Sequence, residues 1–212
     1  GLQDPAYIVI GNILLLPSFN GISGLSSTIG GEKQFGALSY LLGSPAPRAS
    51  LFMGRSFFHI LDGLITVLAA LPIALLIFKV DLSNTNFTLL LFCVVLLSIT
   101  TVGIGFIMGT VTLISRDGWM ITSTLQIALY VLTGVNFSID FLPPALRIIS
   151  MSLPMTRGVM AARMALAGST WETTAPLLLG EILIGILYAV IGYILFQLTT
   201  RSSMNTGALD NV

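Results

Sequence analysis

Charge is scarce in this sequence. Only 8% of its 212 residues are Asp, Glu, Lys or Arg, whereas soluble domains carry roughly a quarter. Nine basic and nine acidic residues give a formal net charge of zero, which excludes the basic surface that nucleic-acid binding needs. With 55% hydrophobic residues and a mean hydropathy of +0.96, the chain cannot cover a globular surface with polar groups. We therefore expect an integral membrane protein.

Cysteine, histidine and nucleotide-binding motifs are also sparse. The single cysteine, Cys93, lies in an apolar run, so no intrachain disulfide can form. One histidine and scattered carboxylates do not make a metal site, and we expect neither a metal nor catalytic residues. No Walker A sequence occurs, and the glycines at 103–109 better suit close helix packing through Gly105 and Gly109. This chain is therefore expected to bind no cofactor and to hydrolyse no ATP itself.

Long apolar runs dominate what is present. A spanning helix needs about 20 mainly apolar residues, and five stretches qualify within a single membrane domain covering residues 1–212. We expect all-α architecture with spans at about 6–29, 57–78, 87–114, 119–137 and 176–198. The first is interrupted by Asn12, Pro17 and Asn20, while Pro176 suits the first position of the last helix.

The stretch between the last two spans, residues 138–175, is not simply hydrophilic. Leu142-Pro-Pro144 and Pro154 divide it into two short apolar segments, at about 145–153 and 155–166. Both are too short to cross a bilayer. We therefore predict two short re-entrant or interfacial helices within residues 142–166.

Residues 31–48 form a charged stretch, punctuated by Gly and Pro, between the first two spans. Glu32 suits the positive end of a helix, and Gly43-Ser-Pro45 is a helix stop. Helical spacing predicts an amphipathic helix at about 32–43 with an apolar face formed by Phe35, Leu38, Leu41 and Leu42. Periodicity alone favours an ordinary interfacial helix. The alternative is a coupling helix that fits a cleft on a cytoplasmic partner.

Basic residues barely constrain the orientation. The face with residues 31–55 carries Lys33, Arg48, Arg55, Arg116 and Arg201, and the other carries Lys79, Arg147, Arg157 and Arg163. A count of five basic residues against four is too even for the positive-inside rule to fix the orientation. We nevertheless prefer the first face as cytoplasmic. Two roles fit Arg147, Arg157 and Arg163: attraction of anionic lipid or phosphate-bearing cargo, or the simpler snorkelling at the outer interface.

Ionisable residues inside expected spans are costly and often functional. Glu181 lies about one turn into the last expected span, and Asp62 lies near the start of the second. Both are near enough to helix ends to reach interfacial water, so we favour a structural or gating role over contact with cargo. His59 precedes Asp62 by three residues, which suits a local hydrogen bond or ion pair better than a metal site.

Two ordered motifs resemble one transporter family. The stretch Glu32-Lys-Gln-Phe-Gly36-Ala-Leu38-Ser-Tyr-Leu41-Leu42-Gly-Ser44-Pro45-Ala-Pro-Arg48 closely resembles the loop after the second transmembrane helix of ABC-2 type transporter permeases. Leu142-Pro-Pro144-Ala-Leu146, Ser150, Leu153-Pro154-Met-Thr156, Ala162-Arg163 and Gly168 are similar to the family's extracellular segment before its last helix. The resemblance covers the whole chain except the family's first helix, so we expect a further helix upstream of Gly1.

The resemblance implies a permease protomer with six transmembrane helices, five of them visible here. It implies pairing with a second permease chain, identical or paralogous, and with two ABC ATPase subunits, among the lipids of a prokaryotic cell membrane. ATP and Mg would bind to the ATPase subunits. The permease would export a lipophilic or amphiphilic compound (drug, lipid, peptide or lipid-linked glycan) by alternating access.

The resemblance also implies residue roles and an orientation, with residues 31–55 inside the cell and 138–175 outside. It assigns ATPase coupling to Glu32, Gly36, Leu38, Leu41, Leu42, Pro45 and Arg48. It assigns the extracellular gate to Pro143, Pro144, Pro154 and Arg163.

Two other function classes are less well supported. An intramembrane lipid-modifying enzyme or protease needs convergent catalytic residues, and the single His59 has no Ser/His or paired-Asp constellation around it in the sequence. A secondary transporter favours an inverted repeat and midplane ion-binding groups, and the sequence shows neither.

Overall fold

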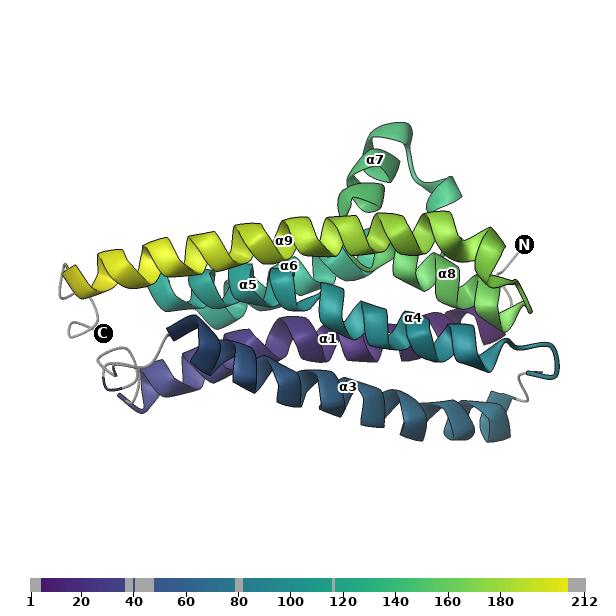
Figure 1. The fold of residues 1–212 in the computed structure, drawn as a ribbon, viewed down its shortest axis with the longest axis horizontal. Coiled ribbons are helices and arrows are strands. Elements are labelled where there is room, and N and C mark those ends of the chain that lie inside the picture. The colour runs from purple at the N-terminus through teal and green to yellow at the C-terminus, as the bar shows by residue number, and fades with distance from the viewer. Residues whose placement is uncertain (1–4, 37–39, 41–47, 79–81, 116, 206–212) are drawn as a thin grey trace.

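The computed structural model describes residues 5–36, 40, 48–78, 82–115 and 117–205, and all regular structure in those ranges is helical (Figure 1). The all-α prediction is thereby confirmed. The elements are α1 (Pro5–Gln34), α3 (Arg48–Phe78), α4 (Phe87–Thr100), α5 (Val102–Ile114), α6 (Gly118–Leu132), the 3-10 turn η1 (Ile139–Phe141), α7 (Pro144–Ser152), α8 (Thr156–Leu166) and α9 (Trp171–Asn205).

The long helices run side by side, and α7 stands out from the bundle beyond α9 (Figure 1). Helix α1 packs most extensively against α3 and α5, α5 packs against α9, and α4 packs against α8. Four stretches are long and apolar enough to cross a membrane: Ile8–Gln34, Gly54–Phe78, Phe87–Ile114 and Trp171–Ser202.

The core lies around α1, α4, α5 and α8. Side chains from all four helices are at most 2% exposed there, including Leu14, Leu89, Leu97, Ile104 and Val159. In contrast, only 18% and 22% of the residues are buried in the most apolar stretches of α3 and α9. Their outward faces carry exposed apolar side chains such as Phe58, Ile65 and Leu183, as expected for helices whose surroundings are lipid.

Helix α1 continues past the expected end at residue 29. Its last turn contains Glu32 and Lys33, so the prediction that Glu32 begins a separate helix is wrong. The helix ends instead at Gln34, and Gly36 two residues later has a positive φ of 67°, which is typical of a residue that closes a helix C-terminus. Residues 37–39 and 41–47, which hold the rest of the predicted amphipathic helix, lie outside the described residues.

The expected span 119–137 is shorter in the structure. Helix α6 ends at Leu132, and its 15 residues reach only roughly 22 Å. The chain turns at Gly134, where φ is 72°, so residues 133–137 do not extend the helix.

The expected span 87–114 is two helices joined at Thr101. The Thr101 hydroxyl donates to the carbonyl oxygens of Leu97 and Ser98, at 2.8 and 3.2 Å. Threonine hydroxyls that bond back to the preceding turn bend helices. The interruption is therefore a local bend between α4 and α5 within one membrane-crossing stretch.

Helix α9 begins at Trp171, five residues before the expected start. Pro176 therefore lies inside the helix and not at its first position. As the sixth residue of the helix, it lacks the N–H that would bond to the Glu172 carbonyl in the first turn. As a consequence Glu181 lies ten residues beyond the helix start, roughly 15 Å along the axis, and not one turn in.

The two short helices expected within 142–166 are present as α7 and α8. Pro143 occupies the N-cap of α7 and Pro144 its first turn. The turn between α7 and α8 contains Met155, which has a φ of 88°. Re-entrant placement of these helices in a bilayer stays a prediction.

Glycines allow three helices to approach closely. A Cβ on Gly103 of α5 would lie 2.5 Å from the Ala189 nitrogen of α9, and one on Gly105 would lie 2.6 Å from the Gly21 oxygen of α1. Backbone contact of this kind is how small residues promote helix association in membranes. Helix α5 is therefore fixed closely against both α1 and α9.

Replacing Gly103 with Ala is expected to lower the unfolding temperature, because the added methyl group would force the α5 and α9 backbones apart. Overpacking of this kind costs about 1–3 kcal/mol. Thermal unfolding in detergent, followed by tryptophan fluorescence, measures the effect. The matched control is Gly54→Ala, because no described heavy atom lies within 4 Å of its added Cβ. Equal unfolding temperatures for the two variants would contradict the close contact.

Candidate functional site

Three helices are tied together at the base of the segment between α1 and α3. Glu32 of α1 forms an ion pair with Arg55 of α3, with side chains 12% and 41% exposed. Lys33 Nζ donates to the carbonyl oxygens of Leu113 and Ser115 at the end of α5, at 3.3 and 3.0 Å. These carbonyls are among those that a helix C-terminus leaves without intrahelical partners. We call these five residues the loop-base cluster.

The predicted coupling residues are only partly described. Glu32 belongs to the loop-base cluster, and Gly36 lies in the turn that follows α1. Arg48 is the first residue of α3, and its side chain is not described. The positions outside the described residues are Leu38, Leu41, Leu42 and Pro45.

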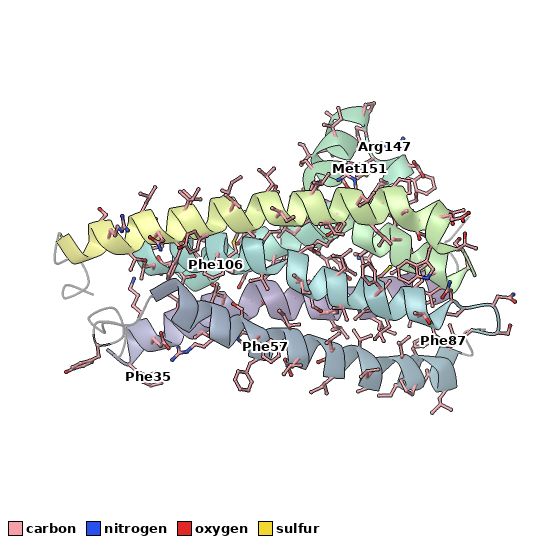
Figure 2. The ribbon with its side chains drawn as sticks, in the orientation of Figure 1. Phe35, Phe57, Phe87, Phe106, Arg147 and Met151 are labelled. Carbon is pink, nitrogen blue, oxygen red and sulfur yellow. The ribbon has the colours of Figure 1, made fainter. Side chains whose placement is uncertain are left out.

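Phe35 adjoins the segment and is 86% exposed, so it points away from the helices (Figure 2). Sequence reasoning missed Lys33 and Arg55 as partners. The signal for Lys33 was its place beside Glu32 in the matched motif, whereas Arg55 reaches Glu32 only through the packing of α1 on α3.

Polar side chains of α1 bond to its neighbours along much of its length. Near its start, Asn12 accepts a hydrogen bond from the Tyr130 hydroxyl at 2.6 Å and donates to Asn136 Oδ1 at 3.2 Å. Farther along, the Ser26 hydroxyl bonds those of Thr112 and Thr122, at 2.7 and 3.2 Å. Lipid offers no partners to such groups, so these bonds fix α1 against α5 and α6.

Asp62 and His59 also pair with α1, and the expected local bond between them is wrong. Asn20 Nδ2 donates to Asp62 Oδ2 at 3.0 Å, and the Thr28 hydroxyl lies 3.4 Å from His59 Nε2. Because α3 begins at Arg48, Asp62 lies fourteen residues into the helix, not near its start. Packing of α3 on α1 places these side chains together, a long-range effect that helix spacing does not reveal.

Glu181 of α9 binds the N-terminus of α8. Its side chain is fully buried, and its Oε1 accepts hydrogen bonds from the Met155 amide at 2.6 Å and the Thr100 hydroxyl at 2.9 Å. Its Oε2 accepts from the Gly158 amide at 3.0 Å. A carboxyl from one helix thus caps another, satisfying amides that have no partner within α8. It also stabilises the left-handed conformation of Met155, which is costly for a non-glycine residue.

Arg163 joins the other end of α8 to the end of α6. Its Nη1 donates to the Gly134 carbonyl at 2.9 Å, and its Nη2 donates to the Val135 carbonyl. The backbone of α1 passes close by, since a Cβ on Gly11 would lie 2.5 Å from Arg163 Nη2. The snorkelling interpretation is therefore wrong for Arg163, which bonds inward to the bundle.

The other predicted gate residues differ in burial. Pro154 is buried at the turn between α7 and α8, whereas Pro143 and Pro144 are exposed. The Ser150 hydroxyl at the end of α7 donates to the Leu132 carbonyl at 2.5 Å. Helix α8 is thus held at both ends, and α7 is attached mainly through its C-terminal end.

The geometry suits mechanical connection between helices. Within the described part of the chain, no group of three or more His, Cys, Asp or Glu side chains is arranged to hold a metal ion. The loop-base cluster connects α1, α3 and α5, while Glu181 and Arg163 connect α8 to α4, α9 and α6.

Replacing Glu181 with Leu is expected to destabilise α8, because the buried amides of Met155 and Gly158 would lose their acceptor. Each buried group left unsatisfied costs about 1–3 kcal/mol. Glu181→Gln should be intermediate, since its carbonyl oxygen keeps two of the three bonds. Hydrogen–deuterium exchange of residues 156–159 measures the effect. Glu172→Gln, at an exposed position of the same helix, is the control. Unchanged exchange in Glu181→Leu would contradict the capping role.

Comparison with known families supports the resemblance seen in the two motifs. The sequence matches the family model for ABC-2 type transporter over residues 3–167. No match was found among curated proteins. The matched region contains the loop-base cluster and all of α1 to α8. The chain therefore belongs to the ABC-2 type transporter family and is a membrane permease of that family.

Proposed function

We propose that this chain is the membrane-spanning subunit of an ATP-driven exporter that moves a lipophilic or amphiphilic compound out of the cytoplasm. Drugs, lipids, peptides and lipid-linked glycans are the candidate cargo classes. The proposal is supported by membership of the ABC-2 family and by the apolar, multi-pass helices. The scarcity of charge in those helices favours lipophilic cargo over a bare ion.

The exporter would contain two ABC ATPase subunits and a second permease chain, in the cell membrane of a prokaryote. ATP and Mg would bind to the ATPase subunits, because this sequence has no Walker A motif. ABC-2 permeases typically work with such ATPase partners. Family membership also favours this function over a secondary transporter or an intramembrane lipid-modifying enzyme.

The loop-base cluster carries the mechanistic part of the proposal. It lies at both ends of the segment between α1 and α3, which is the segment assigned to the ATPase contact. Force applied to that segment would reach α1 and α3 through Glu32 and Arg55, and α5 through Lys33. Helix α5 packs against α9, so all long helices can respond to one input.

At the opposite end, helices α7 and α8 would form the extracellular gate. Helix α8 is attached to α9 through Glu181 and to α6 through Arg163. A change in the tilt of α6 or α9 would therefore displace α8. Alternating access would follow as ATP-driven movement at the cytoplasmic end changes the separation of the helices at the gate.

Coupling can be tested in proteoliposomes that contain the permease with its ATPase partner. Glu32→Gln and Arg55→Gln are each expected to lower stimulation of the ATPase by the permease about fivefold. This factor corresponds to about 1 kcal/mol, which is the contribution expected from a partly exposed ion pair. The double exchange Glu32→Arg with Arg55→Glu should restore part of the stimulation, because it restores the opposite charges.

Arg201→Gln is the matched control, because Arg201 is an exposed arginine near the same end of the bundle. Co-purification checks that each variant still assembles with the ATPase. Normal stimulation in assembled Glu32→Gln and Arg55→Gln complexes would refute the coupling role of the cluster.

A further inference from the structure

A cavity of about 490 Å³ lies between α7 and α9, apart from the contacts that hold α8. Helix α7 contributes Arg147, Ile148 and Met151, α8 contributes Arg157, and α9 contributes Ile184 and Leu187. Figure 2 shows Arg147 and Met151 beside α9, beneath the projecting turns of α7. The cavity therefore combines two guanidinium groups with an apolar wall.

The two arginines bring positive charge and unused N–H donors to the cavity. Arg147 Nη2 lies 2.9 Å from Asp140 Oδ1, in a pair whose side chains are 54% and 66% exposed. Arg157 Nη1 donates to the Met151 carbonyl oxygen. Each guanidinium carries five N–H donors, and these contacts engage one nitrogen of each. Asp140 is solvated, and the carboxyl of Glu181, buried and bonded to the start of α8, also lies close enough to interact with the charge of Arg157. Both guanidinium groups retain N–H donors beyond these contacts.

Gly180 allows Arg157 to lie flat against α9. A Cβ at Gly180 would be 2.7 Å from Arg157 Cδ and 2.9 Å from its Nε. Gly180 lies one turn after Pro176, where the apolar part of α9 begins. The long arginine side chain can therefore place its charge near the boundary between lipid headgroups and acyl chains.

The apolar wall continues along α9 away from the arginines. Ile184 and Leu187 follow Gly180 by four and seven residues, so the wall extends roughly 10 Å toward the middle of the helix. Leu187 is 55% exposed, and Ile148 on the facing helix is 73% exposed. The cationic end and the apolar wall follow one another along the axis of α9, as the headgroup and the acyl chain follow one another in a phospholipid.

We propose that this cavity is a binding site for an anionic phospholipid. The phosphate lies between Arg147 and Arg157, and an acyl chain lies along Ile184 and Leu187. The bound lipid fills the space between α7 and α9 in the leaflet where α9 begins. This is a resident lipid site, and it goes beyond the proposed export function because it does not depend on what cargo is carried.

The test uses the complete transporter complex in a neutral detergent. Dioleoyl phosphatidylglycerol, dioleoyl phosphatidylcholine and inorganic phosphate are added separately, and native mass spectrometry measures the bound lipid. Phosphatidylglycerol is expected to bind at least about fivefold more tightly than phosphatidylcholine, since one arginine near an anionic headgroup contributes about that factor. Inorganic phosphate, which lacks acyl chains, is expected neither to bind detectably nor to displace the lipid.

Arg147→Gln and Arg157→Gln should each lower phosphatidylglycerol binding about fivefold, and Arg201→Gln should leave it unchanged. Ile184→Trp keeps both charges but fills the apolar wall, so it should lower binding as well. If Arg157→Gln fails to fold, Arg147→Gln on the exposed helix still decides the question.

Three results would overturn the proposal. Equal binding of the two lipids would show that charge is not recognised. Full binding in Ile184→Trp would show attraction to the surface and no acyl site. Displacement of the lipid by inorganic phosphate would indicate a site for the phosphate group alone.

Discussion

Buried backbone must find its hydrogen-bond partners within the protein, because apolar surroundings offer none. Glu181 meets this requirement for the N-terminus of α8, and Arg163 meets it for the carbonyls that follow α6. Without these two side chains, the segment between α6 and α9 would expose unpaired polar groups. The left-handed turn at Met155 is bonded to Glu181, and α1 passes close to Arg163 at Gly11.

The same constraint explains why this permease has polar contacts at both ends and close apolar contacts between them. At one end the loop-base cluster joins α1, α3 and α5; at the other, Glu181 joins α8 to α9. The contacts of Gly103 with α9 and Gly105 with α1 connect the two ends through the helix backbones. A bundle built in this way can move whole helices while the hydrogen bonds and ion pair between them stay intact.

Composition and apolar run length were sufficient to predict the all-α membrane fold, because lipid imposes those features on each helix separately. Proline also marked α7 and α8 correctly. Helix ends were less predictable: α1 continues to Gln34, and α9 starts before Pro176. Partners such as Arg55 for Glu32 could not be predicted, because the polar stripe of Arg55, His59 and Asp62 on α3 does not show which helix it meets.

The central claim is that force at the segment between α1 and α3 moves α1 relative to α9, while α8 stays fixed on α9. Distances between spin labels test it in the assembled transporter, with Cys93 replaced by Ala and one labelled copy per complex. The account predicts that ATP shifts the distance between labels at Phe35 and Arg201, and that the distance between Met160 and Thr173 stays constant. An unchanged Phe35–Arg201 distance during ATP turnover, or a shift confined to Met160–Thr173, would contradict it.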